Sequence, residues 1–175
     1  MDSSEFREFL RSRSSVRVFA PDPVPEEQIQ YLLSCASTAP SAGNLEAWDV
    51  VAVTDPEVRE VLADAALSQS HVAEAPLVLV VCSNYVRSMS RYGERGILYG
   101  LEDAAIACTY LMLAAHAAGL SSCWTGAFDD EEVRTILGLP AHVRPVALLA
   151  VGRSRQAPVR TGRMPPEDHL HREEW

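Results

Sequence analysis

The sequence predicts an α+β fold in which a few buried strands lie among helices. Residues 77–82 form a continuous aliphatic run, as expected for a strand that is covered on both faces. Two further strand-like segments and several stretches with helical spacing of apolar residues accompany it. Strands and helices do not alternate regularly, which argues against a doubly wound parallel sheet. The predicted strands cover residues 48–53, 77–82, 122–124 and 143–151.

Prolines, aspartates and one glycine mark where the predicted helices begin and end. Residues 20–25 hold three prolines and must be extended. Asp55 followed by Pro56 is a typical helix start, as is Asp129, and Gly119 is a typical stop. The predicted helices cover residues 3–11, 25–39, 56–65, 97–118 and 129–137.

The helix predicted over residues 97–118 is apolar nearly all round, so we expect it to be central and buried. Its apolar stretch is too short and too weakly apolar for a membrane span. After Gly152 the chain becomes polar and rich in proline. No repeat, low-complexity segment or linker divides the sequence, so residues 1–175 are expected to form a single domain.

The charge balance is acidic, with 24 Asp and Glu against 15 Lys and Arg, for a net charge of −9. This argues against nucleic acid as the main partner, because such binding depends largely on neutralising phosphates. Nothing in the composition favours a membrane, and no charged and then apolar leader is visible, so a cytoplasmic location is expected. The four cysteines are widely spaced in apolar surroundings and are expected to be buried free thiols.

The most informative segment is a basic heptad, Arg11-Ser12-Arg13-Ser14-Ser15-Val16-Arg17, in this otherwise acidic chain. Arginine presents a planar fork of donors that stays charged, and serine adds short hydroxyl donors with little bulk. This combination suits a compact, highly charged anion such as phosphate. A solvated helix end or a basic arm would show the same run, so the heptad alone leaves both interpretations open. Neither of the common glycine-rich phosphate loops is present.

Two later segments could line a ligand that lies close to the backbone. Residues 39–48 connect a predicted helix to a strand, and their small side chains allow close approach. Asn44 offers both a donor and an acceptor there, which suits a flat heterocycle with imide edges. The segment Trp124-Thr125-Gly126-Ala127-Phe128 precedes a helix, where backbone N–H groups can point at a bound ring. Each segment alone also fits an ordinary turn.

Together these three segments and the C-terminal Gly162-Arg163-Met164-Pro165-Pro166-Glu167 closely resemble the motifs of the nitroreductase family of FMN-dependent oxidoreductases. The resemblance extends from about Phe9 to Trp175. It implies a three-layer sandwich with a central, mostly antiparallel sheet flanked by helices. It also implies a two-fold homodimer with FMN at the interface. Whether the tail from about residue 156 wraps the partner subunit stays open.

The resemblance implies a set of residues that contact FMN. The phosphate and ribityl chain would be held by Arg13, Ser14, Ser15, Arg17 and Arg163. The ring would be lined from the other subunit by Pro40, Ser41 and Asn44, and on its reactive N5 side by Thr125 and Gly126. No general acid or base is expected, since the cofactor carries the chemistry. Arg11 is interpreted as a surface charge, and His116 as a satisfied core histidine.

The function implied is hydride transfer from NADH or NADPH through flavin N5 to a small-molecule acceptor, such as a nitroaromatic, a quinone or another conjugated electrophile. Two departures from the family pattern concern the acceptor and the redox tuning. Glu46 stands where a glutamine is usual, and Thr109-Tyr110 where Gln-Asn is common. Two alternatives stay open: an FMN-dependent dehydrogenase or oxidase of another substrate, and a non-catalytic flavin-binding module.

Overall fold

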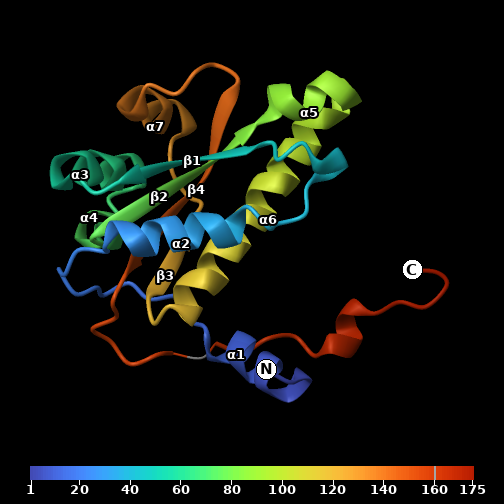
Figure 1. The fold of residues 1–175 in the computed structure, drawn as a ribbon, viewed down its shortest axis with the longest axis horizontal. Helices are drawn as coiled ribbons and strands as arrows, with labels where there is room; N and C mark the ends of the chain where they lie inside the picture. Colours follow the sequence, from blue (N-terminus) through green and yellow to red (C-terminus); the bar gives the residue numbers. More distant parts are fainter. Residues whose placement is uncertain (160) are drawn as a thin grey trace.

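A four-stranded antiparallel sheet forms the centre of the molecule (Figure 1). The computed structural model describes residues 1–159 and 161–175. The strand order is β1-β2-β4-β3, and all three neighbouring pairs are antiparallel. The strands are β1 (Trp48–Val53), β2 (Leu77–Asn84), β3 (Ser121–Thr125) and β4 (Val143–Gly152). The predicted α+β class and its mostly antiparallel sheet are therefore confirmed.

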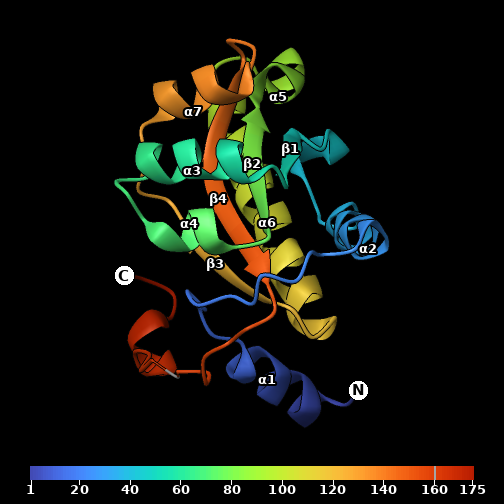
Figure 2. The same ribbon diagram turned by 90° about the vertical axis from the view of Figure 1, so that its left-hand side faces the viewer.

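Helices cover both faces of this sheet and make three layers (Figure 2). Every residue of β2 is buried, because alternate side chains of a strand point to opposite faces. Leu77, Leu79 and Val81 pack in one core with α2 (Glu26–Ala36) and α6 (Arg95–Ala117). The intervening β2 side chains pack in a second core with the helices of the other face. Those helices are α3 (Pro56–Ala65), α4 (Ser70–Glu74) and α7 (Asp130–Leu137).

The starts of α3 and α7 lie where the sequence predicts them, whereas α6 begins at Arg95, two residues before its predicted start. The Asp55 carboxylate accepts from the backbone N–H groups at the start of α3, and Asp129 does the same for α7. The α2 helix ends at Ala36, three residues before the predicted end. A turn follows, in which the Ala39 N–H donates to the Ala36 carbonyl.

The long helix α6 is central but less buried than the sequence predicts. Nine of its residues are buried against the sheet and neighbouring helices, whereas Ile97 and Leu98 are exposed. Within the described residues α6 is the one helix long and apolar enough to cross a membrane by length and composition. Its buried residues pack against the sheet in the core of the protein.

Two short helices and two 3-10 turns are not predicted from the sequence. The most consequential is α5 (Tyr85–Tyr92), which packs on the start of α6. A Cβ at Gly96 would lie 2.4 Å from the Met89 backbone nitrogen, so only glycine permits this crossing. The others are α4 and the 3-10 turns η1 (Ala42–Asn44) and η2 (Pro166–His169).

The first helix, α1 (Ser3–Ser12), lies at one end of the molecule and buries none of its residues. It is attached through Phe9, which packs on the His116 ring with centroids 4.9 Å apart, and through Ser12, whose hydroxyl is 2.7 Å from His116 Nε2. The chain after α1 runs beside the sheet, where the Val16 N–H donates to the Ser122 carbonyl of β3. The C-terminal tail passes close to α1 (Figure 1).

Candidate functional site

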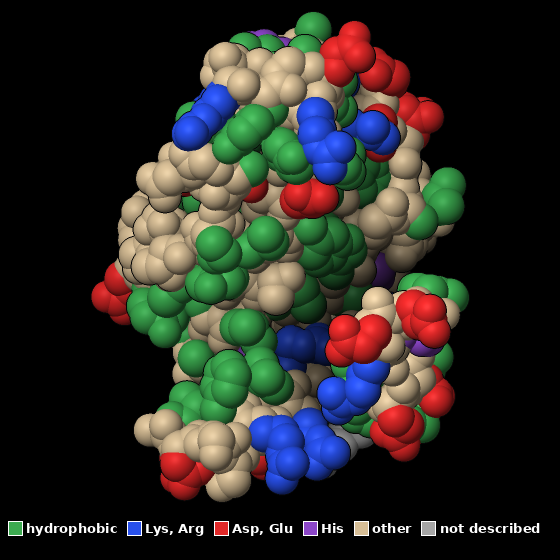
Figure 3. Space-filling view, turned by 90° about the vertical axis from the view of Figure 1, so that its right-hand side faces the viewer, with side chains coloured by type: hydrophobic (Ala, Val, Ile, Leu, Met, Phe, Trp, Pro, Cys, Tyr) green, Lys and Arg blue, Asp and Glu red, His purple; other side chains and the backbone are tan. Residues whose placement is uncertain are grey.

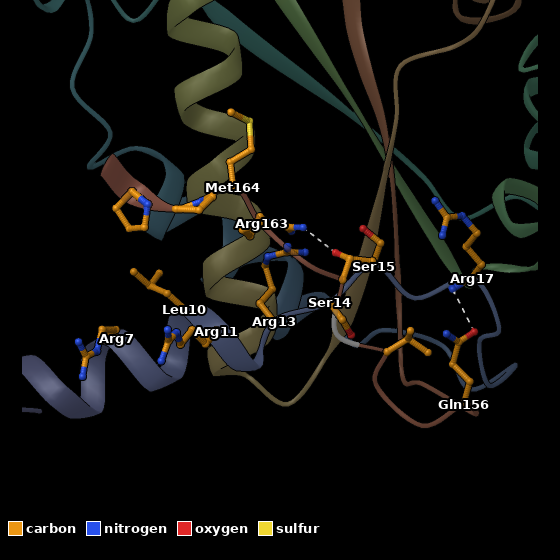
Figure 4. Close-up of a pocket in the computed structure, with 14 residues that line it drawn as sticks. Arg7, Leu10, Arg11, Arg13, Ser14, Ser15, Arg17, Gln156, Arg163 and Met164 are labelled. Carbon is orange, nitrogen blue, oxygen red and sulfur yellow. Dashed lines mark hydrogen bonds between the residues drawn. The ribbon is translucent and has the colours of Figure 1, made fainter. Parts of the chain in front are cut away.

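A cavity of about 880 Å³ lies between α1, the residues that follow α1, and the C-terminal tail. Fourteen residues line it (Figure 4). They include all of the heptad's predicted phosphate ligands and the arginine predicted from the tail. The predicted residues that the structure brings together here are Arg13, Ser14, Ser15, Arg17 and Arg163.

The cavity is strongly positive because five of its lining residues are arginines and none is acidic. Figure 3 shows arginine side chains gathered around a hollow in the lower half of that face. Arg13 Nη1 is buried without a hydrogen-bond partner. None of the ion pairs found among residues 1–159 and 161–175 includes a cavity arginine. A buried guanidinium with an unused donor is costly unless an anion binds it.

Local backbone structure turns the heptad toward the cavity. Val16 is 3% exposed and packs with Phe19, Ala75 and Ala150, which anchors this segment to the sheet. Because successive side chains of an extended segment point to opposite sides, burying Val16 turns Ser15 and Arg17 outward. The parallel bridge between Ser15 and Ser122 of β3 holds this orientation.

Arg7 and Arg11 of α1 complete the set of five arginines. The interpretation of Arg11 as only a surface charge is therefore incomplete, because its exposed side chain also lines the cavity. Arg7 is not among the residues predicted from the sequence to bind the phosphate. Its position four residues before Arg11, on the same side of a helix, is the signal available in the sequence.

The loop with Pro40, Ser41 and Asn44 lies at the other end of α6 and does not line the cavity. It is held near Asp103, whereas the heptad side is attached at His116. Thirteen residues of helix separate these two contacts, which at about 1.5 Å per residue is about 20 Å. One copy of the chain therefore does not bring the loop and the arginines together.

Asp103 organises this loop, a role that is not predicted from the sequence. The carboxylate is 2% exposed and accepts from the backbone N–H of Ala42 at 2.8 Å and of Ala47 at 3.1 Å. Such charge-assisted bonds are stronger than neutral ones. A carboxylate within an otherwise apolar helix is the signal that could have identified it.

Helix α5 supports the same loop from its other side. Arg87 Nη1 donates to the carbonyls of Glu46 at 2.9 Å and Trp48 at 3.0 Å. Gly43 has a φ of 60°, and a Cβ there would lie 2.5 Å from the Tyr92 hydroxyl. Glu46, the departure from the family's usual glutamine, has an exposed side chain, and its N–H donates to Ser41 Oγ.

Thr125 and Gly126 lie at the end of β3 and outside the cavity lining. The Thr125 side chain is 3% exposed, and its hydroxyl is 2.7 Å from His71 Nε2. It therefore points into the protein, so this turn can offer a ligand its backbone and the exposed Gly126. Gln69 Nε2 donates to the Ala127 carbonyl at 3.1 Å and stiffens the turn further.

Comparison with known proteins agrees with this geometry. The sequence model described as "Nitroreductase family" matches residues 10–73 and 65–153. The chain belongs to the nitroreductase family. A curated relative, NADH dehydrogenase from Thermus thermophilus, is 35% identical to this chain, and the alignment covers 89% of each protein.

Solved structures of family members share this fold. "Structure of B. megaterium NfrA2" superposes with a TM-score of 0.92 at 26% identity, covering all of this chain and 76% of that one. "NADPH:FMN oxidoreductase from Vibrio harveyi complexed with NAD+" has a TM-score of 0.89 at 28% identity, covering 97% and 77%. The predicted family and its three-layer sandwich are thus confirmed.

His71 of this nitroreductase family member lies against Thr125 at the end of β3. Its pKa lies below the ordinary value because burial and the positive charge of Arg17 disfavour the imidazolium, while Glu74 acts in the opposite direction. The folded state therefore favours the neutral form of the His71 ring. The stability it contributes is present above about pH 6.5 and is lost as the pH falls through the lower pKa of the folded state.

We expect the unfolding temperature to fall as the pH is lowered from about 7 to 5, and to fall less steeply in His71→Gln. Scanning calorimetry across this range measures both. His142 is exposed, so His142→Gln serves as the control and should keep the full pH dependence. A His71→Gln profile parallel to that of the wild type would contradict this assignment.

His116 and the cysteines have structural roles. His116 is half-buried and held by Ser12 and Phe9, as predicted for a satisfied histidine. Three of the four cysteines are buried free thiols and Cys35 is half-buried. Burial raises the pKa of Cys82 to about 12. No group of three His, Cys, Asp or Glu side chains that could hold a metal ion occurs in the described part of the chain.

Proposed function

We propose that this protein passes hydride from NADH or NADPH, by way of FMN, to a small conjugated electrophile such as a nitroaromatic or a quinone. Its family makes it an FMN-dependent NAD(P)H oxidoreductase. The observation that carries the proposal is the cavity with five arginines and no carboxylate, where that family requires a phosphate site. The acceptor class rests on the nitroreductase relatives.

Arg13, Ser14, Ser15, Arg17 and Arg163 would hold the FMN phosphate and ribityl chain. They fit this group, since the buried and unpartnered Arg13 Nη1 needs an anionic acceptor. Guanidinium forks match phosphate oxygens in pairs, and the serine hydroxyls can donate between them. When bound, FMN supplies the hydride chemistry, while the protein orients and encloses it.

We further propose that two copies of the chain, each a single domain, share the site. Pro40, Ser41 and Asn44 of one copy would line the flavin ring held by the other, because within one copy they lie about 20 Å away along α6. Thr125 and Gly126 would face the ring with their backbone. The exposed apolar residues Ile97 and Leu98 of α6 would be covered by the second copy.

In Figure 3, hydrophobic side chains also gather above the hollow that the arginine side chains surround. The second copy of the chain would lie on this face. A tail that wraps the second copy from about residue 156 would close the cavity further. A location in the cytoplasm and the absence of nucleic-acid or membrane partners stay predictions.

The purified protein should be yellow, and NADH or NADPH should bleach the flavin absorbance under anaerobic conditions. Adding a quinone or a nitroarene should restore it. FMN should also raise the unfolding temperature of flavin-free protein, because a ligand that binds only the folded state stabilises it.

The outcomes separate the alternatives. Protein that is colourless and shows no thermal shift with FMN contradicts the flavin site. Bound flavin that neither nicotinamide bleaches favours a dehydrogenase or oxidase of another substrate. Flavin that is reduced but never reoxidised by an acceptor favours a binding module. A monomer that binds FMN on sizing would contradict the shared site.

A further inference from the structure

Arg7 and Arg11 lie beyond the arginines that the FMN phosphate needs. Both line the cavity from α1, one helical turn apart (Figure 4). No hydrogen bond or ion pair found among residues 1–159 and 161–175 uses either side chain. Their charges are therefore available to a ligand.

Helix stability accounts in part for Arg11, because this residue lies in the last turn of α1, where the helix dipole favours a cation, but it does not account for Arg7. Like charges four residues apart destabilise a helix by about 0.2–0.5 kcal/mol. Helix α1 buries no residue, so it gains little from core packing to offset that cost. A positively charged helix side that faces a cavity is better explained by what the cavity holds.

The charge count leaves room for a second anion. A phosphate monoester carries about −1.5 to −2 charges at pH 7. Arg13, Arg17 and Arg163 already exceed that, and Arg7 and Arg11 add two more positive charges to a cavity whose lining holds no acidic residue. The cavity of about 880 Å³ is also near the upper end of ligand sites, which are about 300–1,000 Å³.

Apolar side chains stand beside these two arginines. Leu10 lies between Arg7 and Arg11 in the sequence of α1, and Met164 and Pro165 of the tail line the same cavity. Apolar side chains next to guanidinium groups suit a ligand that carries a base as well as a phosphate. Free inorganic phosphate would use the arginines but not the apolar surface.

We propose that Arg7 and Arg11 form a second anion subsite, which binds a phosphate group of the incoming nicotinamide dinucleotide beside the FMN phosphate. This inference rests on the proposed function. The phosphate could be the pyrophosphate that NADH and NADPH share, or the 2′-phosphate that only NADPH carries, and the two sources predict different kinetics.

The test is steady-state kinetics of the FMN-loaded enzyme with NADH and NADPH and a saturating soluble quinone. In Arg7→Gln/Arg11→Gln we expect KM for the dinucleotide to rise about 10- to 100-fold, with kcat within about twofold and FMN content unchanged. A rise for both donors identifies the pyrophosphate, and a rise for NADPH alone identifies the 2′-phosphate. Glutamine keeps helix propensity while removing the charge.

The matched control is Arg95→Gln/Arg144→Gln, which removes the same charge from arginines outside the cavity lining. Three results would overturn the inference: an unchanged KM for both donors, an equal rise in the control, or loss of FMN from the α1 variant. If neither donor bleaches the wild-type flavin, the proposed function itself fails, and this outcome is distinct from the others.

Discussion

Replacing Arg13 and Arg17 together with alanine is expected to weaken FMN binding by about 10²- to 10⁴-fold. Each hydrogen bond to a charged group contributes about 1.5–3 kcal/mol, and about 1.4 kcal/mol corresponds to a factor of ten in affinity. The two side chains line the cavity next to Arg163. The remaining arginines would then retain only weak attraction for the phosphate.

The flavin-free variant should stay folded. Neither guanidinium takes part in an ion pair found among the described residues, and Arg13 Nη1 has no partner to lose. Removing two like charges from a positive cluster also relieves repulsion. The segment itself is anchored by the buried Val16, which the substitutions do not touch.

Flavin titration by fluorescence quenching measures the affinity, and circular dichroism of flavin-free protein checks the fold. The control Arg95→Ala/Arg144→Ala removes two arginines outside the cavity and should bind FMN as the wild type does. A double variant at Arg13 and Arg17 that still purifies with a full complement of flavin would place the phosphate elsewhere.

Asp103→Asn should destabilise the protein by about 2–4 kcal/mol. The buried carboxylate accepts from two backbone N–H groups, of Ala42 and Ala47. An amide keeps one oxygen acceptor but turns an NH₂ group toward the other N–H, so that one bond is lost and a buried donor is left unpaired. For a chain of 175 residues this corresponds to a fall in Tm of roughly 4 to 16 °C.

Scanning calorimetry of the flavin-free protein measures this change. The neighbouring Glu102 is exposed on the same helix, so Glu102→Gln makes the same change of charge without the two bonds. Its Tm should stay within about 2 °C of the wild type, since surface substitutions usually change stability by less than about 0.5 kcal/mol. Equal shifts in the two variants would show that the charge of α6, and not the loop contact, matters.

Local signals in the sequence account for much of the fold. The β1 bounds agree with the prediction, and Asp55 and Asp129 cap the helices that they are predicted to start. These features depend on neighbours only a few residues away, which a sequence displays directly. Helix α5 was missed because its short polar segment is stabilised by packing on α6 across Gly96, a contact between elements.

For the candidate site, too, the sequence predicts some features and the tertiary structure decides others. The sequence by itself identified the heptad, the loop near Asn44 and the Thr125 turn as ligand-facing candidates, because each combines small residues with donors in a short stretch. Only the tertiary structure decided that the heptad and Arg163 share one cavity, while Asn44 lies at the other end of α6.

Some residues have a role in the structure that the sequence does not predict, because their partners are far away along the chain. Asp103 acts through a loop about sixty residues earlier, and His71 through Thr125, 54 residues later. Arg7 acquires significance only because the tail brings Arg163 and Met164 to the same cavity. Periodicity and caps determine the local elements of this protein. Packing between segments far apart in the chain decides which charged side chains lie close together and how deeply each one is buried.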